Sequence, residues 1–314
     1  MGKPLGIIVT LAFVLAACSE DPAVTTAPTG GSGSTVSGET AFPVTVTGTG
    51  GDVTIDARPE RIVSLSPTAT EDLFAIGAGD QVIAVDDQSN YPTDAPITDL
   101  SGFEPNVEAI AGYEPDLVVY ATEPGDLGSS LEDLGITALQ LDAAPDLDAA
   151  YQQIEQLGAA TGHADGSAAL VDRMRSDIQG LVDGADPAAG TSFYYELDDT
   201  YYSVTSKTFI GKLFEMLGLR NIADAVGKGS GGYPQLSAEY IIESNPDLIF
   251  LADTKCCGQS AETVAGRPGW AGLAAVTGGD VVPLDDDVAQ RWGPRVVDLL
   301  RQISDAAAAE ADAA

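Results

Sequence analysis

The sequence has a single histidine and three cysteines among its 314 residues. His163 lies between Gly162 and Ala164, in a break between two helical patterns, so it supports neither a histidine zinc site nor a Ser-His-Asp triad. A Gly-x-x-x-x-Gly-Lys-Ser/Thr phosphate-binding loop is also missing. Most hydrolase mechanisms therefore lack their base, and the sequence offers no P-loop of an ATPase.

Basic residues are scarce, with 14 Lys and Arg against 48 Asp and Glu and a formal net charge of -34. A chain this acidic repels phosphate backbones, which excludes nucleic acid as a partner. The acidic surplus is spread along the chain, a pattern that favours a heavily hydrated or salt-adapted surface over a cation trap. Apolar residues make up 44% of the chain, enough for a sizeable core.

Long hydrophobic runs are also missing, because the apolar stretch from Leu5 to Ala17 is too short to span a bilayer. It follows Lys3 and ends in Leu15-Ala-Ala-Cys18, which resembles a bacterial lipobox. We predict a lipoprotein signal peptide over residues 1–17 and lipidation of Cys18, with an ordinary signal peptide as the alternative. The expected location is extracytoplasmic and membrane-anchored, at the cell surface or in the periplasm.

Residues 18–41 contain mostly Gly, Ser, Thr and Pro and have no apolar period. Such a segment cannot bury enough surface to offset its ordering entropy, which predicts a flexible tether behind the lipidated cysteine.

The body of the chain alternates strands with helices, the pattern of a mostly parallel α/β sheet. Residues 42–55 predict a hairpin, and later apolar runs predict strands separated by helices. The expected strands are 61–65, 81–85, 116–120, 136–141, 192–197 and 280–284.

An internal repeat divides this body. The segment from Asn106 to Val118 matches the segment from Ser237 to Ile249, each pair of residues being 131 positions apart. Each copy has a helix-capping residue, a short helix and Pro-Asp before a buried strand. We therefore predict two related lobes over residues 42–145 and 186–314, the second with a C-terminal helix and acidic tail. An inter-lobe helix over 146–185 is expected to join them and to leave a cleft between them.

Ligands of parallel α/β lobes bind at the loops that follow the carboxyl ends of the strands. Exposed aromatic residues near such loops suit a large, flat ligand, although plugging the lobe interface is the alternative for each of them. The predicted ligand-binding residues are Ser66, Pro67, Thr68, Tyr91, Phe103, Thr122, Tyr201, Tyr202, Tyr233, Cys256, Cys257, Arg291 and Trp292.

Cys256 and Cys257 are adjacent, so a disulfide between them would be a strained ring. A free dithiol that meets a metal-bearing ligand and a structural loop staple are the alternatives. Two thiols are too few for a structural zinc site, and we predict no metal site and no resident cofactor.

Several motifs together resemble the solute-binding proteins of bacterial ABC importers for ferric siderophores, haem and cobalamin. The resemblance extends from about Phe42 to Ile303. The motifs are Arg61-Ile-Val-Ser-Leu-Ser66-Pro67, Thr70-Glu71, Ser89-Asn-Tyr91-Pro92, Glu114-Pro-Asp-Leu-Val-Val119, Tyr233-Pro-Gln-Leu-Ser-Ala-Glu239 and Trp292-Gly-Pro294-Arg295.

The resemblance implies a class III solute-binding protein, with two Rossmann-like α/β lobes, mostly parallel sheets and one long joining helix. It implies that Tyr233 packs against ligand. It also implies that Glu108 and Glu239, which the helix dipole alone would also favour, dock onto arginines of a permease dimer.

We therefore expect a monomeric, non-enzymatic substrate-binding subunit that delivers a metal chelate to an ABC permease with a cytoplasmic ATPase. A ferric siderophore or a corrinoid is the expected ligand, with haem third. A surface lipoprotein enzyme acting in the inter-lobe cleft is the alternative from another class.

Overall fold

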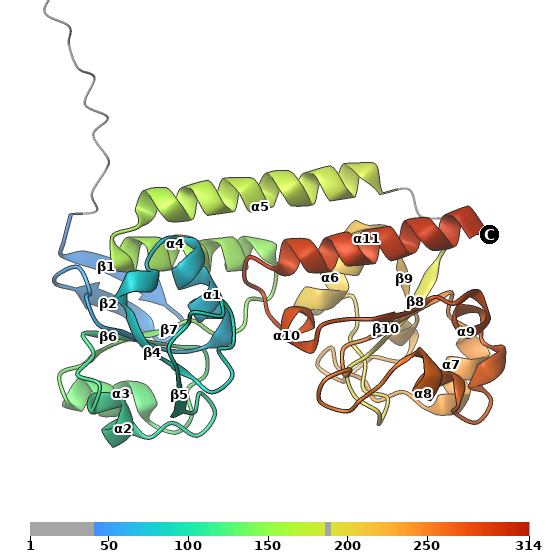
Figure 1. Ribbon diagram of the computed structural model, residues 1–314, viewed down its shortest axis with the longest axis horizontal. Helices are drawn as coiled ribbons and strands as arrows, with labels where there is room; N and C mark the ends of the chain where they lie inside the picture. Colours follow the sequence, from blue (N-terminus) through green and yellow to red (C-terminus); the bar gives the residue numbers. More distant parts are fainter. Residues whose placement is uncertain (1–40, 186–189, 314) are drawn as a thin grey trace, which may run out of the picture. The chain divides into compact units, whose positions relative to one another are not determined.

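The computed structural model describes residues 41–185 and 190–313, which belong to one compact unit (Figure 1). The predicted signal peptide, Cys18 and the tether up to residue 40 lie outside the described residues. Within these ranges, two separate parallel sheets and one antiparallel hairpin are present. The hairpin consists of β1 (Val44–Gly48) and β2 (Gly51–Ile55), which confirms the prediction for residues 42–55.

The first lobe is built on a five-stranded parallel sheet in the order β5-β4-β3-β6-β7. All four residues of β3 and of β6 are buried, as expected for central strands covered by helices on both faces. Its strands are β3 (Ile62–Leu65), β4 (Val82–Asp86), β5 (Ile97–Leu100), β6 (Leu117–Tyr120) and β7 (Thr137–Gln140). Its helices are α1 (Pro67–Ala75), α2 (Val107–Ala111) and α3 (Leu127–Asp133), with a 3₁₀ turn η1 (Gly79–Gln81).

The second lobe has a four-stranded parallel sheet in the order β11-β10-β8-β9. Its strands are β8 (Ser192–Glu196), β9 (Arg220–Asn221), β10 (Leu248–Leu251) and β11 (Val281–Pro283). Its helices are α6 (Phe209–Met216), α7 (Ala238–Ser244), α8 (Ala261–Ala265), α9 (Ala274–Gly278), α10 (Asp286–Ala289) and α11 (Val296–Ala313), with 3₁₀ turns η2 (Ile222–Ala225) and η3 (Trp270–Gly272).

The internal repeat forms the same unit in both lobes. Asn106 caps α2 by accepting a hydrogen bond from the Ala109 amide at 3.0 Å, and Ser237 caps α7 through the Tyr240 amide at 3.2 Å. Each helix leads into a strand, β6 or β10, that pairs with the first strand of its sheet, β3 or β8.

Two helices lie between the lobes in the sequence. α4 (Leu147–Thr161) packs on β1 and α1, and α5 (Ala164–Gly184) packs on α4 and beside α11 (Figure 1). The single inter-lobe helix expected over 146–185 is thus two helices, of which α5 is the long one. Gly162 takes a left-handed φ of 78° and ends α4, so the chain turns at His163. Among the described residues, no helix is both long and apolar enough to cross a membrane.

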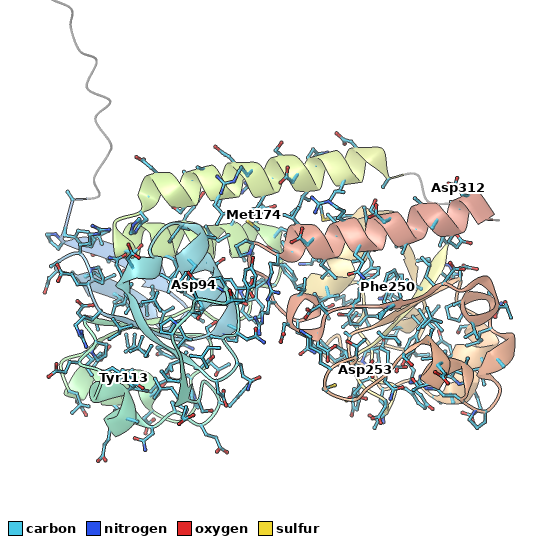
Figure 2. The ribbon with its side chains drawn as sticks, viewed as in Figure 1. Asp94, Tyr113, Met174, Phe250, Asp253 and Asp312 are labelled. Atoms are coloured by element: carbon cyan, nitrogen blue, oxygen red, sulfur yellow. The ribbon has the colours of Figure 1, made fainter. Side chains whose placement is uncertain are left out.

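Aromatic rings fill the core of the second lobe. Phe193 on β8 stacks on Phe214 of α6 with ring centroids 4.1 Å apart, and Phe250 of β10 meets Phe214 edge-on at 4.9 Å. Figure 2 shows Phe250 within this lobe and Met174 on α5. These contacts fix the strands whose carboxyl ends carry the candidate site.

Replacing Phe214 with Ala removes a fully buried ring, and we expect a loss of about 3–5 kcal/mol in the free energy of unfolding. Phe103→Ala is the matched control, since Phe103 is 75% exposed and its loss is expected to change stability by about 0.5 kcal/mol or less. Denaturant unfolding measures both variants. Equal losses would contradict this description of the core.

Candidate functional site

A cavity of about 590 Å³ is lined by loops of both lobes. The first lobe contributes loops that follow β3, β4, β5 and β6, and the second contributes the loops after β10 and β11. Both sheets are parallel, so the loops that follow the carboxyl ends of their strands gather at one edge of each sheet. The sequence analysis expected ligand binding at these loops. Eight of the predicted ligand-binding residues line this cavity: Ser66, Pro67, Thr68, Phe103, Thr122, Cys256, Arg291 and Trp292.

Helix capping places the first of these groups. Ser66 is the N-cap of α1, where its hydroxyl accepts a hydrogen bond from the Ala69 amide at 3.3 Å, and Pro67 takes the first helical position. Thr68 follows in the first turn. The loop after β3 is therefore rigid where it meets the cavity.

Tyr233 lies next to this cavity. It lines a neighbouring hollow of about 420 Å³, whose wall also includes Gln290, Arg291 and Trp292 of the first cavity. The Tyr233 side chain is 53% exposed and available to a ligand that extends between the two hollows.

The other four predicted residues lie outside the lining of the first cavity. Tyr91 faces the Arg295 guanidinium at 4.3 Å in a separate hollow, and Tyr201 stacks on Trp270 at 5.7 Å. Tyr201 has a left-handed φ of 69°, a turn conformation that the sequence pattern did not reveal. The backbone of Tyr202 pairs with Gln235, and Cys257 is exposed.

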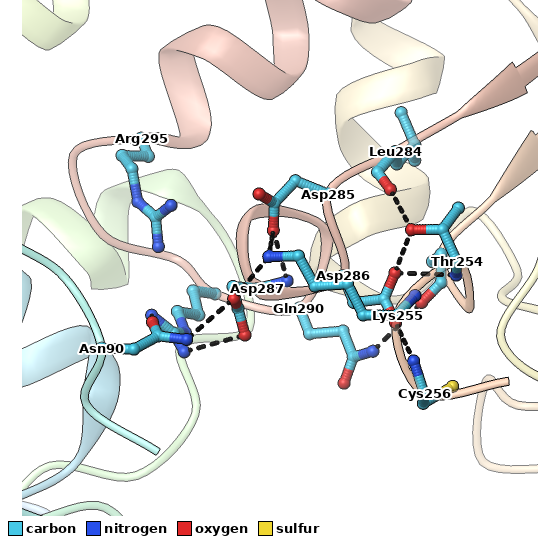
Figure 3. A network of polar contacts seen from close by, with 12 residues as sticks. Asn90, Thr254, Lys255, Cys256, Leu284, Asp285, Asp286, Asp287, Gln290 and Arg295 are labelled. Carbon is cyan, nitrogen blue, oxygen red and sulfur yellow. Dashed lines mark hydrogen bonds and ion pairs between the residues drawn. The ribbon is translucent and has the colours of Figure 1, made fainter. Parts of the chain in front are cut away.

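Sequence reasoning missed the residue that holds the second-lobe loop in place. Asp286 is buried, and its carboxylate accepts hydrogen bonds from the backbone amides of Thr254, Lys255 and Cys256 at 2.8–2.9 Å (Figure 3). The run Asp285-Asp286-Asp287 after the last strand was the sequence feature that could have pointed to this carboxylate. Cavity-lining residues that were not individually named as ligand-binding residues are Leu65, Asp86, Gln88, Gly102, Ala121, Lys255, Asp286, Asp287 and Gln290.

The charges that line the cavity are largely neutralised. Lys255 pairs with Asp285 at 2.6 Å and with Asp287 at 2.7 Å (Figure 3). Burial raises the pKa of Asp86, against hydrogen bonds from Ser89 and from the Gln88 amide that lower it.

A buried ion cluster joins the lobes. The Glu71 carboxylate on α1, which is 1% exposed, accepts hydrogen bonds from Arg291 at 2.9 Å and from Arg295 at 2.9 and 2.5 Å. Arg291 also donates to the Gln88 carbonyl at 2.8 Å and to Asn90 at 3.1 Å. We call Glu71, Arg291 and Arg295 the inter-lobe ion cluster.

The cluster touches the cavity because Arg291 belongs to both. Next to it, the Trp292 indole donates to Gln153 of α4 at 2.8 Å, which orients the ring.

A buried carboxyl group lies at the start of the loop that carries Cys256. Asp253 follows β10 and is fully buried, and burial together with the Glu196 carboxylate raises its pKa to about 7 (Figure 2). Glu196 is itself paired with Arg267 through two 2.6 Å contacts. Asp253 does not line the cavity.

In the part of the chain that the structure describes, no three His, Cys, Asp or Glu residues are placed to hold a metal ion. His163 lies near Arg58, with 3.2 Å between Nε2 and the guanidinium, away from the cavity.

Comparison with known families shows the class of protein that this fold and site define. The family model described as periplasmic binding protein matches residues 62–288. The chain belongs to this family.

Individual relatives align with most of the chain. The chain is 30% identical to an ABC transporter substrate-binding lipoprotein of Bacillus subtilis, over 84% of this chain and 85% of the relative. It is 31% identical to the cobalamin-binding protein of Halobacterium salinarum, over 85% of this chain and 74% of the relative.

Among solved structures, the periplasmic vitamin B12-binding protein of Vibrio cholerae matches with a TM-score of 0.65 and 25% identity, over 80% of this chain and 98% of that chain. The predicted family and the two-lobed, class III α/β fold are confirmed. Since the family and these relatives are binding proteins, the protein is a binding protein and the alternative of an enzyme is set aside.

Replacing Glu71 with Gln leaves two buried guanidinium groups without their carboxylate, and we expect a loss of about 3 kcal/mol in the free energy of unfolding. Asp298→Asn is the control, because Asp298 pairs with Arg301 at the surface and such pairs are worth about 1 kcal/mol or less. Urea unfolding compares the two. A Glu71→Gln loss no greater than the control would show that the cluster does not hold the lobes.

Proposed function

We propose that this protein is the lipid-anchored, extracytoplasmic substrate-binding subunit of an ABC importer and that it captures a corrinoid in the inter-lobe cavity. The observation that carries the proposal is the cavity lined by both lobes, with Phe103 on one side and Trp292 on the other. The names of the cobalamin-binding and vitamin B12-binding relatives support the ligand class.

The lining suits a flat macrocycle with amide substituents. Phe103 is 75% exposed and presents a ring for stacking, and hydroxyl and amide groups line the same cavity. These polar groups are Ser66, Thr68, Thr122, Gln88 and Gln290. Hydroxyl and amide side chains both donate and accept hydrogen bonds, so they can pair with amides around the rim of a corrin ring.

The charge of the lining favours a corrinoid over a strongly anionic ferric siderophore. Among the described lining residues, the cations are Lys255 and Arg291, and both are already paired with carboxylates. With no unpaired cation among these residues, the lining offers no counter-charge to an anionic chelate.

The anchor and the partner belong to the same proposal. Lipidation of Cys18 would hold the body outside the membrane through the tether of residues 18–41, and the lipoprotein named among the relatives supports this arrangement. The lobes would then be residues 42–145 and 186–314, and the protein would act as a monomer.

Glu108 and Glu239 are the proposed contacts with the permease. Both are exposed in the first turns of equivalent helices, α2 and α7. Within the described ranges, neither carboxylate has a hydrogen-bonding or ion-pairing partner, so both are available to arginines of a permease dimer.

Cyanocobalamin binding tests the ligand. At a concentration a hundred times its dissociation constant, it should stabilise the folded protein by about 2.7 kcal/mol, and thermal unfolding measures the shift. Phe103→Ala should weaken binding about tenfold through loss of stacking, whereas Tyr202→Ala, outside the cavity, should leave it unchanged. Stabilisation by ferric siderophores and not by corrinoids would replace the proposed ligand, and no stabilisation by either would contradict the site.

Charge reversal tests docking. Glu108→Arg together with Glu239→Arg should abolish uptake in cells that carry the matching importer and should leave ligand affinity within about twofold of the original, because neither residue lines the cavity. Reversal at Glu262, an exposed glutamate in the first turn of α8, is the control and should leave uptake intact. Normal uptake by the double variant would contradict the docking role.

A further inference from the structure

A side hollow adjoins the ligand cavity. It is the hollow of about 420 Å³ that Tyr233 lines, and it shares Gln290, Arg291 and Trp292 with the wall of the cavity. The two spaces are therefore adjacent, which places a long substituent of a cavity-bound ligand within reach of the side hollow.

The side hollow differs in charge from the chain as a whole. The chain has 48 acidic and 14 basic residues, yet the described residues that line the side hollow include two basic ones, Lys207 and Arg291, and no acidic one. The lining of the ligand cavity, by contrast, includes Asp86, Asp286 and Asp287. An acid-free wall in so acidic a protein favours a negatively charged group of a ligand over a cation.

Lys207 is the free cation of this wall. Arg291 is already paired with Glu71 at 2.9 Å and with Asp287 at 3.1 Å. Lys207 is exposed, and within the described ranges its ammonium group has no hydrogen-bonding or ion-pairing partner. A single free positive charge matches one monoanionic group, because further negative charges would meet no counter-charge in this wall.

Two nearby carboxylates have partners of their own. Asp224 accepts hydrogen bonds from the amide and the hydroxyl of Ser206, the residue before Lys207, both at 2.8 Å. Asp146 is paired with Lys212 at 3.2 Å. Neither carboxylate pairs with Lys207, so the charge of this lysine is available to a ligand.

We propose that the side hollow receives the nucleotide loop of a complete corrinoid and that Lys207 pairs with its phosphodiester. This inference rests on the proposed function, since it assigns one part of the proposed ligand. A nucleotide loop carries a single negative charge on its phosphodiester, together with a ribose and a base. A lysine ammonium binds phosphate as a point charge, and the Tyr233 ring, 53% exposed in the same hollow, offers a face to the base.

This assignment makes the side hollow a specificity site. Cobinamide has the corrin ring and its amides but lacks the nucleotide loop, so it fills the cavity and leaves Lys207 unpaired. The protein should therefore distinguish complete from incomplete corrinoids through contacts in the side hollow, while contacts in the cavity are common to both.

Two corrinoids and two lysine variants test the assignment. Isothermal titration calorimetry of the full chain at low ionic strength gives Kd values for cyanocobalamin and for dicyanocobinamide, which is neutral like cyanocobalamin. Lys207→Met removes the charge from the side hollow and keeps most of the length of the side chain. Lys228→Met is the matched control, because Lys228 is also exposed and has no partner among the described residues, yet it lines neither space.

We expect the unaltered protein to bind cyanocobalamin about tenfold more tightly than dicyanocobinamide. Lys207→Met should weaken cyanocobalamin binding about fivefold, the size expected of one partly exposed ion pair, and should leave dicyanocobinamide binding unchanged. This loss should shrink as the ionic strength rises, because salt screens an exposed pair. Lys228→Met should leave both Kd values within about twofold of the original.

Equal weakening of both corrinoids by Lys207→Met would overturn the contact with the phosphodiester, as would cyanocobalamin binding that this variant leaves unchanged. Equal affinity of the unaltered protein for the two corrinoids would overturn the role of the side hollow. Each of these results leaves the proposed function standing, because cyanocobalamin still binds. Failure of the unaltered protein to bind either corrinoid would overturn the proposed function and this inference with it.

Discussion

The geometry of the cavity depends on one buried carboxylate. Glu71 lies on α1 of the first lobe, and its partners Arg291 and Arg295 are 220 and 224 positions further along the chain, in the second. A buried carboxylate is costly to desolvate, and the two guanidinium groups offset that cost only when the lobes meet in the observed way. Arg291 also lines the cavity, so the contact that holds the lobes together also shapes the site.

The two parallel sheets explain why the site lies between the lobes. In a parallel sheet, the loops that follow neighbouring strands leave from the same edge. Ser66 follows β3 and Thr122 follows β6 in the first sheet, and Cys256 follows β10 in the second. The chain therefore builds one cavity from two copies of the same unit. Differences between the copies, such as Phe103 in the first and the Cys256 loop in the second, give the two sides of the cavity different chemistry.

Much of this architecture could be predicted from the sequence. Short buried strands, helix caps and the 131-residue repeat are local signals, and they identified both sheets and the loops with Ser66, Thr68 and Cys256. Strands β5 and β9 were missed. β5 buries only Leu100 and β9 has only two residues, so neither shows an apolar period.

Long-range contacts limited the prediction of the site. Glu71 and its arginines are too far apart in the sequence for any periodicity to pair them. The three tyrosines Tyr91, Tyr201 and Tyr202 follow strands or precede helices as ligand-binding residues do, yet contacts with Arg295, Trp270 and Gln235 place them outside the cavity. Asp286 was missed because its role is to bind backbone amides of another loop, which composition does not reveal.

The central claim is that a corrinoid binds between the lobes and contacts both. Amide hydrogen exchange, measured with and without cyanocobalamin, tests it most directly because protection is assigned to individual segments. We predict slower exchange in the first-lobe loop around Phe103 and in the second-lobe segments 255–256 and 286–292, which contribute to the cavity lining. Protection confined to one lobe, or located at the separate hollow between α4, α5 and α6 that Tyr151 and Phe209 line, would contradict the account.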